Sequence, residues 1–360
     1  MRHWATKEES ARIRKIRAIR GEVTLHDLRL MTMHPQIIIA GHICLDVIPT
    51  IDGGEARIET LLQPGRMTHT GPMLAATGGV VSNTGQALHR LGVPVRLMGK
   101  VGGDVWGDAV VRIVSELSPE LAAGLLRAPE EAGSYTVIIS TPNTDRIFLH
   151  YPGPNDTFTA DDLDYAAIGA ARLFHFGYPP IMQRMYQHGG AELERLFAQV
   201  KALGVTTSLD MTYPDPNAES GKVDWRAILR RVLPHVDLFT PSIDEIRYML
   251  ADDPLLAGAE AAKPVTAAAL DAIATQLLEM GVAVVLIKLG AAGLYLRTTD
   301  DSKRLLALGG GAPSEPSAWQ GKRLHQPGLR AWVQGTTGAG DCAIAGFLAA
   351  FVRDCTPEEA

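Results

Sequence analysis

Short apolar runs alternate with longer helical stretches through the middle of this chain. The runs cover residues 172–176, 205–210 and 236–240, and helical patterns extend to residue 203 and over residues 225–233. Alternation at this spacing predicts parallel βαβ units in a doubly wound sheet flanked by helices. Residues 36–41 and 282–290 have the continuous apolar, β-branched character of buried strands, so we expect two further strands there.

The composition excludes several classes of protein. Hydrophobic residues make up 46% and charged residues 21% of the 360 positions, which is ordinary for a globular protein with a large core. The net charge of -6 provides no general basic surface for nucleic acid. No apolar run approaches the length of a membrane span. Cys44, Cys342 and Cys355 show no metal-binding spacing and cannot all pair, which fits a reducing, cytoplasmic location.

The two ends of the sequence differ from the rest. Residues 1–34 carry a basic patch with acids before it, and we expect a solvated extension, or a natural start at Met31 or Met33. Residues 356–360 have the Thr cap and first-turn Pro that begin a further helix.

A glycine-rich stretch, residues 335–341, runs directly into an apolar helix-forming stretch. The backbone N–H groups at a helix N-terminus lack intrahelical partners and favour an anion. Asp341 lies at this point, where a carboxylate suits a base that takes a proton from a hydroxyl. The alternative interpretation is a glycine turn with Asp341 as a helix cap.

Polar residues also follow the first strand and a second glycine pair. Asp46 comes just after the strand that ends at Gly41, where it could accept hydrogen bonds from a polyol or simply cap a turn. The sequence after Gly41 lacks the dinucleotide fingerprint, which disfavours a dehydrogenase. Asn83 follows Gly78 and Gly79 at the start of a helix, where it could face a ligand or act as a helix cap.

Two segments predict a small β-rich unit outside the main sheet. Residues 49–76 are too long for an ordinary connection, include a β-like piece at 65–70, and are expected to form a lid or insertion. Residues 135–140 and 146–150 predict a hairpin. We place the lid at about 49–76 and 133–153.

Two motifs in the right order resemble the signatures of the ribokinase-like (PfkB) carbohydrate kinases. Residues 335–341 resemble the D-T-x-G-A-G-D signature, and residues 78–107 match the N-terminal signature throughout its spacing. The resemblance covers residues 35–360. It implies an α/β fold with a doubly wound, mostly parallel sheet flanked by helices, and a small β-rich lid.

The resemblance implies transfer of the ATP γ-phosphoryl group to a hydroxyl of a sugar or sugar-like molecule, with Mg²⁺ bound to ATP. Asp341 would be the base, and the backbone of Gly338, Ala339, Gly340 and Asp341 would be the anion hole. The implied substrate-binding residues are Asp46, Gly78, Gly79, Asn83 and Asn155. The implied nucleotide-binding residues are Lys288, Gly290, Gly293, Thr336, Thr337 and Glu245. Glu245 would lie near Mg²⁺ and contact it through water, and the resemblance implies no direct metal ligand.

Several departures from the family pattern leave alternatives open. Relatives usually continue beyond the position of Ala360 with a helix beside the adenine pocket, so we expect either a trimmed chain or a partly open nucleotide pocket. Gly335 stands where many relatives carry an Asp that holds a monovalent cation, so potassium activation stays open. Ser242 replaces the usual Asn two residues after a strand. Residues 209–213 lack the Asn and Arg that some sugar-acid and fructose kinases carry there, which disfavours a carboxylated sugar. Ribose, fructose, a nucleoside or an inositol stay open as substrates. A catalytically impaired sugar- or nucleoside-binding protein is the alternative function, and the resemblance also implies a homodimer through the lid.

Overall fold

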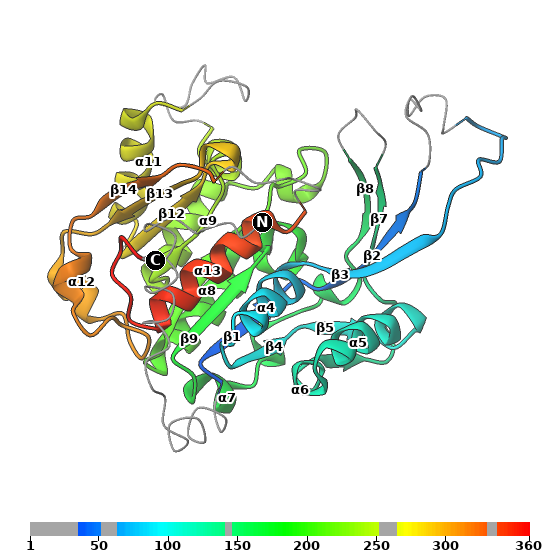
Figure 1. Ribbon diagram of the computed structural model, residues 1–360, viewed down its shortest axis with the longest axis horizontal. Helices are drawn as coiled ribbons and strands as arrows, with labels where there is room; N and C mark the ends of the chain where they lie inside the picture. The colour runs from blue at the N-terminus through cyan, green and yellow to red at the C-terminus, as the bar shows by residue number, and fades with distance from the viewer. Residues whose placement is uncertain (1–34, 52–62, 141–145, 252–264, 330–336) are drawn as a thin grey trace, which may run out of the picture.

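An eight-stranded sheet forms the centre of the molecule. The computed structural model describes residues 35–51, 63–140, 146–251, 265–329 and 337–360 (Figure 1). The strand order is β14-β13-β12-β11-β10-β9-β1-β4. All neighbours pair in parallel except β13, which is antiparallel to both β12 and β14. The predicted doubly wound, mostly parallel sheet is therefore confirmed. Its strands are β1 (Ile37–Gly41), β4 (Val95–Met98), β9 (Leu173–Gly177), β10 (Thr206–Asp210), β11 (Leu238–Phe239), β12 (Val284–Lys288), β13 (Leu294–Thr298) and β14 (Arg323–Gln326).

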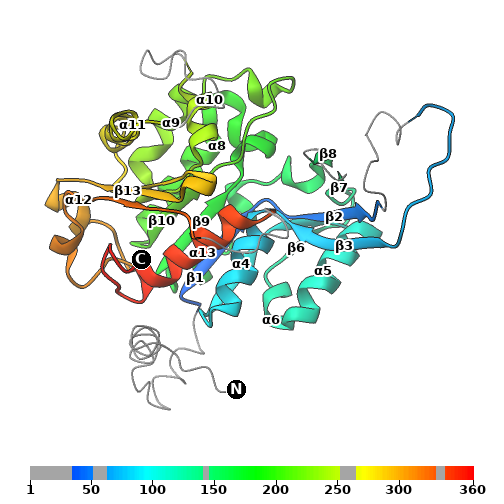
Figure 2. The ribbon, with the colours of Figure 1, turned by 45° about the horizontal axis from the view of Figure 1, so that its top comes forward.

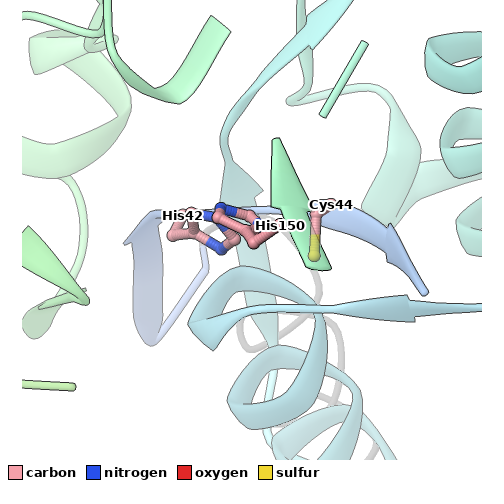
Figure 3. A group of neighbouring side chains, drawn as sticks. All are labelled: His42, Cys44 and His150. Carbon is pink, nitrogen blue, oxygen red and sulfur yellow. The ribbon is translucent and has the colours of Figure 1, made fainter. Parts of the chain in front are cut away.

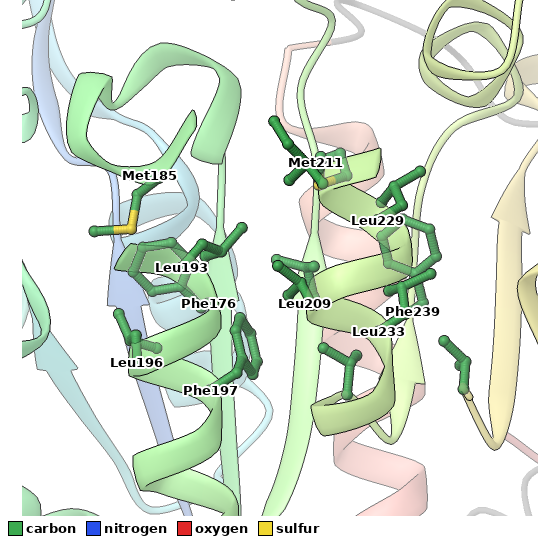
Figure 4. Packing of buried hydrophobic residues seen from close by; sticks show 14 of the residues in the cluster. Phe176, Met185, Leu193, Leu196, Phe197, Leu209, Met211, Leu229, Leu233 and Phe239 are labelled. Atoms are coloured by element: carbon green, nitrogen blue, oxygen red, sulfur yellow. The ribbon is translucent and has the colours of Figure 1, made fainter. Parts of the chain in front are cut away.

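Helices cover both faces of this sheet, which explains the continuous apolar runs of its strands. In β1, Ile37 and Ile39 pack on one face and Ile38 and Ala40 on the other. The first face is covered by α4 (Val80–Arg90), α5 (Val105–Leu117), α6 (Pro119–Ala122), α12 (Ser302–Leu306) and α13 (Ala339–Val352). The second is covered by α7 (Tyr165–Gly169), α8 (Gln183–Ala202), α9 (Trp225–Val232), α10 (Ile243–Met249) and α11 (Ala267–Glu279), and Figure 4 shows the packing of α8 and α9 there.

A second, four-stranded sheet projects from one side of the main body (Figures 1 and 2). Its order is β3-β2-β7-β8, with β2 (Cys44–Pro49), β3 (Met73–Gly78), β7 (Tyr135–Ile139) and β8 (Ile147–Tyr151). β7 and β8 form the predicted hairpin. The expected strand at 65–70 is wrong: β3 begins only at Met73, which pairs with Pro49, the last residue of β2. Because β2 ends at Pro49, residues before Met73 have no residue of β2 opposite them with which to pair.

The remaining strands, β5 (Lys100–Gly102) and β6 (Leu126–Ala128), form a short parallel pair. Among the described residues, no helix has the length and hydropathy needed to cross a membrane. Residues 1–34, for which we expected an extension, lie outside the described residues.

Candidate active site

Asp341 is held by three side chains from distant parts of the chain. It lies in the first turn of α13 and is only 4% exposed. Asn83 Nδ2 donates to Asp341 Oδ2 at 3.1 Å, and Thr84 Oγ1 donates to Oδ1 at 3.2 Å, both from α4. The Tyr178 hydroxyl donates to both carboxylate oxygens at 2.8 Å. The carboxylate is thus fixed in orientation before any ligand arrives.

The backbone of α13 begins beside this carboxylate without a capping side chain. Gly338 is the N-cap residue, and its left-handed φ of 72° suits glycine. Because no side chain caps the helix, the first-turn N–H groups are available to an anion. A Cβ atom added to Gly340 would lie 3.7 Å from Lys288 Nζ, so an ammonium group lies against the same turn. The arrangement places an uncapped helix N-terminus and an ammonium group next to the Asp341 carboxylate.

Lys288 is paired at the end of the sheet and is not a solvated residue. Its Nζ lies 2.6 Å from Oδ1 of Asp210, which is fully buried at the end of β10. Burial raises the pKa of Asp210, and the Lys288 ammonium only partly offsets this effect. Burial alone would lower the pKa of Lys288, but the carboxyl groups of Asp210 and Glu245 outweigh it and raise that pKa.

The carboxyl groups outnumber the ammonium at this end of the sheet. Asp210, Glu245 and Asp341 all act electrostatically on Lys288. Asp210 Oδ2 is buried and has no hydrogen-bond partner among the described residues. Excess carboxylate oxygen next to an anion-binding turn fits a hard cation such as Mg²⁺, which prefers oxygen ligands and retains waters.

Tyr178 occupies a strained backbone position at the end of β9. Its φ of 71° is in the left-handed region, which a bulky side chain rarely adopts. Such strain persists where the surroundings require it, and it concentrates at functional sites. Burial of its hydroxyl and the neighbouring Asp341 raise the pKa of Tyr178 well above its usual value, so the hydroxyl keeps its proton and acts as a donor.

Asp46 lies on β2 against the glycine pair that precedes α4. A Cβ atom on Gly78 would lie 2.4 and 2.6 Å from the two Asp46 carboxylate oxygens, so only glycine fits there. Gly79, with φ of 86°, is the N-cap residue of α4. Asp46 therefore lies at the start of the helix that carries Asn83, and burial raises its pKa.

A protein-family model described as "pfkB family carbohydrate kinase" matches residues 57–360. The chain belongs to this family. Similar curated proteins include an "Uncharacterized sugar kinase" of Archaeoglobus fulgidus, 24% identical over 76% of this chain and 88% of that protein. "Fructokinase-2" of Zea mays is 23% identical over 60% of this chain and 61% of that protein.

Solved structures share the fold of this pfkB family member. Arabidopsis thaliana ribokinase, in a structure with ribose and ATP, has a TM-score of 0.66 and 18% identity, covering 91% of this chain and 89% of that one. Xylella fastidiosa fructokinase with bound ATP has a TM-score of 0.65 and 19% identity, and the match covers 90% of this chain and 87% of that one. The predicted family is therefore confirmed, and the protein is a carbohydrate kinase.

The structure brings most of the expected pfkB site residues to one end of the sheet. Asn83 donates to Asp341 and also lies next to Gly338, and Lys288 lies next to Gly340 in the same turn. The helix-cap interpretation of Asn83 is wrong, because α4 begins at Val80 and the cap is Gly79. Ala339 begins α13, Thr337 lies exposed in the preceding turn, and Gly335 and Thr336 lie outside the described residues.

Other expected residues have structural contacts. Asn155 is fully buried, and its amide bonds Ile43 N, Ile43 O and Pro152 O, so we assign it the role of fixing the turn before β2. Glu245 is buried in the first turn of α10, where it forms a capping box with Ser242.

The two glycines expected near the nucleotide differ in their surroundings. A Cβ atom on Gly293 would collide with Gln326 O, whereas one on Gly290 would meet nothing within 4 Å. Gly293 therefore permits close approach of the segment that leads toward residues 330–336, and Gly290 is free of such a constraint.

Sequence reasoning missed Tyr178, Thr84 and the partner of Lys288. Tyr178 and Asp210 each end or follow a buried strand, where open α/β sheets bind ligands. A position at the end of a buried strand was therefore the sequence signal that could have identified Tyr178 and Asp210. Thr84 offered none beyond its place next to Asn83.

Proposed function

We propose that this carbohydrate kinase transfers the γ-phosphoryl group of MgATP to a hydroxyl of a neutral sugar, with Asp341 as general base. The observation that carries the proposal is the Asp341 carboxylate, held by Asn83, Thr84 and Tyr178 beside the uncapped N-terminus of α13. Phosphoryl transfer requires mainly positioning and charge stabilisation, and this arrangement supplies both.

In the transfer, Asp341 takes the proton of the acceptor hydroxyl as that oxygen forms its bond to the γ-phosphorus. The bond from the γ-phosphorus to the bridging oxygen breaks, and ADP leaves with that electron pair. The first-turn amides of α13 stabilise the developing charge, and Lys288 adds a positive charge beside them. A small-sheet lid over the site, built from β2, β3, β7 and β8, would exclude water.

Asp210 and Glu245 are the residues that would orient Mg²⁺ and its waters near the nucleotide phosphates. When bound, Mg²⁺ supplies charge neutralisation of the phosphate oxygens. Potassium activation stays open, because Gly335 lies outside the described residues.

The named relatives and the sequence at residues 209–213 both favour a neutral sugar. Among similar proteins are fructokinases and a ribokinase. Residues 209–213 lack the Asn and Arg that some sugar-acid and fructose kinases carry there, which disfavours a carboxylated sugar. The test is ADP release from MgATP across fructose, ribose, 2-keto-3-deoxygluconate, nucleosides and inositols. Turnover on a neutral sugar supports the proposal. Sugar binding without turnover on any compound would favour the non-catalytic alternative.

Gly78→Ala is expected to lower kcat/KM for the sugar by about tenfold or more. We propose that Asp46 accepts hydrogen bonds from hydroxyls of the sugar. The new Cβ atom displaces its carboxylate, and losing a hydrogen bond to a charged group costs about 1.5–3 kcal/mol. The KM for MgATP should stay unchanged. Gly346→Ala is the matched control, because a Cβ atom there meets nothing within 4 Å. An unchanged kcat/KM for the sugar in Gly78→Ala would show that Asp46 does not bind the sugar.

Tyr178→Phe is expected to lower kcat by about tenfold, the equivalent of about 1.4 kcal/mol, because the hydroxyl holds both oxygens of Asp341. Tyr295→Phe is the control, since it removes a tyrosine bond to Asp271, a carboxylate on α11. Steady-state kinetics distinguish the two variants. A rise in kcat for Tyr178→Phe would show that the tyrosine competes with the acceptor hydroxyl for the base.

We propose that two copies of the chain pair through the small sheet. Its edge strands β3 and β8 expose Met73, Leu74, Phe148 and Leu149, and exposed apolar edges favour pairing with another chain. Sedimentation equilibrium should show a dimer that Leu149→Lys converts to a monomer. Leu306→Lys, an exposed leucine on α12, should leave the dimer intact.

A further inference from the structure

Two histidines and a cysteine converge at the base of the small sheet (Figure 3). His42 lies in the turn after β1, Cys44 begins β2, and His150 comes from β8. A nitrogen of each histidine and the Cys44 sulfur all lie within 4.8 Å of one another. The proposed phosphoryl transfer assigns no role to these three side chains.

The spacing of the two imidazoles matches that of two ligands on one ion. His42 Nε2 lies 3.3 Å from His150 Nε2. In a tetrahedral zinc site with Zn–N bonds of about 2.1 Å, two ligand nitrogens lie about 3.4 Å apart. The other nitrogen of His42, Nδ1, is buried and has no hydrogen-bond partner among the described residues. No described hydrogen bond outside the cluster therefore opposes rotation of this ring toward an ion.

Hydrogen bonds with neighbouring side chains hold Cys44, the third candidate ligand, in position. The Cys44 sulfur is 3.5 Å from Thr136 Oγ1, which also lies 3.0 Å from His150 Nδ1. The Cys44 thiol donates to Asp46 Oδ1 at 3.4 Å. Outer hydrogen bonds of this kind orient metal ligands. Cys44 and His42 are buried, whereas His150 is exposed, so an ion can enter past His150.

We propose that His42, Cys44 and His150 bind a transition-metal ion of the zinc class, with a fourth position open to water. Imidazole and thiolate ligands select such ions over Mg²⁺, which requires oxygen ligands, so the site is distinct from that of MgATP. As the sulfur–metal bond forms, the Cys44 thiol releases its proton to solvent. The ion joins β2 to β8 and lies next to Asp46, the residue that we propose grips the sugar.

A consequence follows that rests on the proposed function. An ion beside Asp46 attracts its carboxylate and occupies space next to it, so metal and sugar should compete. We expect Zn²⁺ to raise the KM for the sugar without changing the KM for MgATP. An unchanged KM for the sugar in the zinc-loaded enzyme would show that the metal ion and the sugar do not compete.

Cobalt titration of the full-length protein tests metal binding without needing any turnover. With a non-thiol reductant present, Co²⁺ should bind at one ion per chain, giving tetrahedral visible bands and a thiolate-to-cobalt charge-transfer band, both displaced by Zn²⁺. Cys44→Ser should abolish the charge-transfer band, and His150→Ala should weaken Co²⁺ binding by about tenfold or more. Cys342→Ser and Cys355→Ser should keep the spectrum, since these cysteines lie elsewhere in the fold.

Two outcomes would overturn the site. One is the absence of a charge-transfer band in the wild-type protein. The other is a band that survives Cys44→Ser and is lost in Cys342→Ser or Cys355→Ser. Because Cys44 is buried and its replacement could impair folding, each variant is first compared with the wild type by circular dichroism. His150 is exposed, so His150→Ala provides the test if Cys44→Ser does not fold.

Discussion

Asp341→Asn is expected to reduce kcat by a factor of about 10² to 10⁴, the range that a positioned general base contributes. Asparagine keeps the shape of the side chain but cannot take the acceptor proton. The KM for MgATP should change little, because the amides of the α13 N-terminus and Lys288 are unaltered. Steady-state kinetics with the sugar identified in the substrate panel provide the measurement.

The fold should survive this substitution. Asp341 forms no ion pair within salt-bridge distance among the described residues, and its hydrogen bonds come from Asn83, Thr84 and Tyr178. Asp108→Asn is the matched control: it makes the same chemical change in the first turn of α5, where the acid is exposed on the surface. A kcat for Asp341→Asn within tenfold of the wild type would show that the base lies elsewhere.

The sequence predicted the strands β1, β9, β10, β11 and β12 because they are buried on both faces, whereas the exposed edge strand β14 was not predicted. Residues Ile37–Ala40 pack against helices on both sides, and such strands read as continuous apolar runs. The β7–β8 hairpin was equally visible. The strand expected at 65–70 was wrong, because β-like composition does not say whether a partner strand reaches that far.

The contacts of the site were less predictable, because they join residues far apart in the chain. Asn83 and Asp341 are separated by 258 positions, and only the family resemblance linked them. Nothing in the sequence near Lys288 indicated that Asp210 would pair with it. The three cysteines showed no metal-binding spacing, yet the topology places Cys44, on the inner strand β2, beside His42 and beside His150, which lies on the edge strand β8. Register and topology set such contacts, and local spacing cannot reveal them.

Ser242 illustrates a local departure that the structure explains. Its hydroxyl accepts from Glu245 N, while the Glu245 carboxylate accepts from Ser242 N at 2.6 Å. A serine is a favoured N-cap residue, so the replacement of the family's asparagine retains a capped α10. The carboxylate of Glu245 is thereby fixed near Lys288.

Lys288→Met is expected to destabilise the protein by about 3–5 kcal/mol, the usual cost of removing one partner from a buried ion pair. Asp210 would be left fully buried without its ammonium partner. Turnover should also fall, by about 10² or more, because a positive charge beside the anion-binding turn is lost. Urea unfolding measures the first effect and kinetics measure the second.

The stability loss should depend on pH in a definite direction. Burial already raises the pKa of Asp210 in the wild-type protein, and removing Lys288 removes the group that opposes this shift. In the unfolded chain an aspartate titrates at about 3.9. Between that pH and the raised folded pKa, the folded variant retains a proton that the unfolded chain has lost, so stability falls as pH rises. Burial already raises the wild-type pKa of Asp210 to about 8, so both folded proteins keep this proton up to that pH. The deficit relative to the wild type should therefore grow only above it and be larger at pH 9 than at pH 7.

A double variant separates the two effects of Lys288. Lys288→Met with Asp210→Leu replaces the buried pair by apolar groups, which often restores stability. We expect the double variant to recover most of the unfolding free energy and to lose the pH dependence of the deficit, while turnover stays low. Recovery of turnover together with stability would mean that Lys288 contributes only to folding, and that the α13 N-terminus alone stabilises the transferred phosphoryl group.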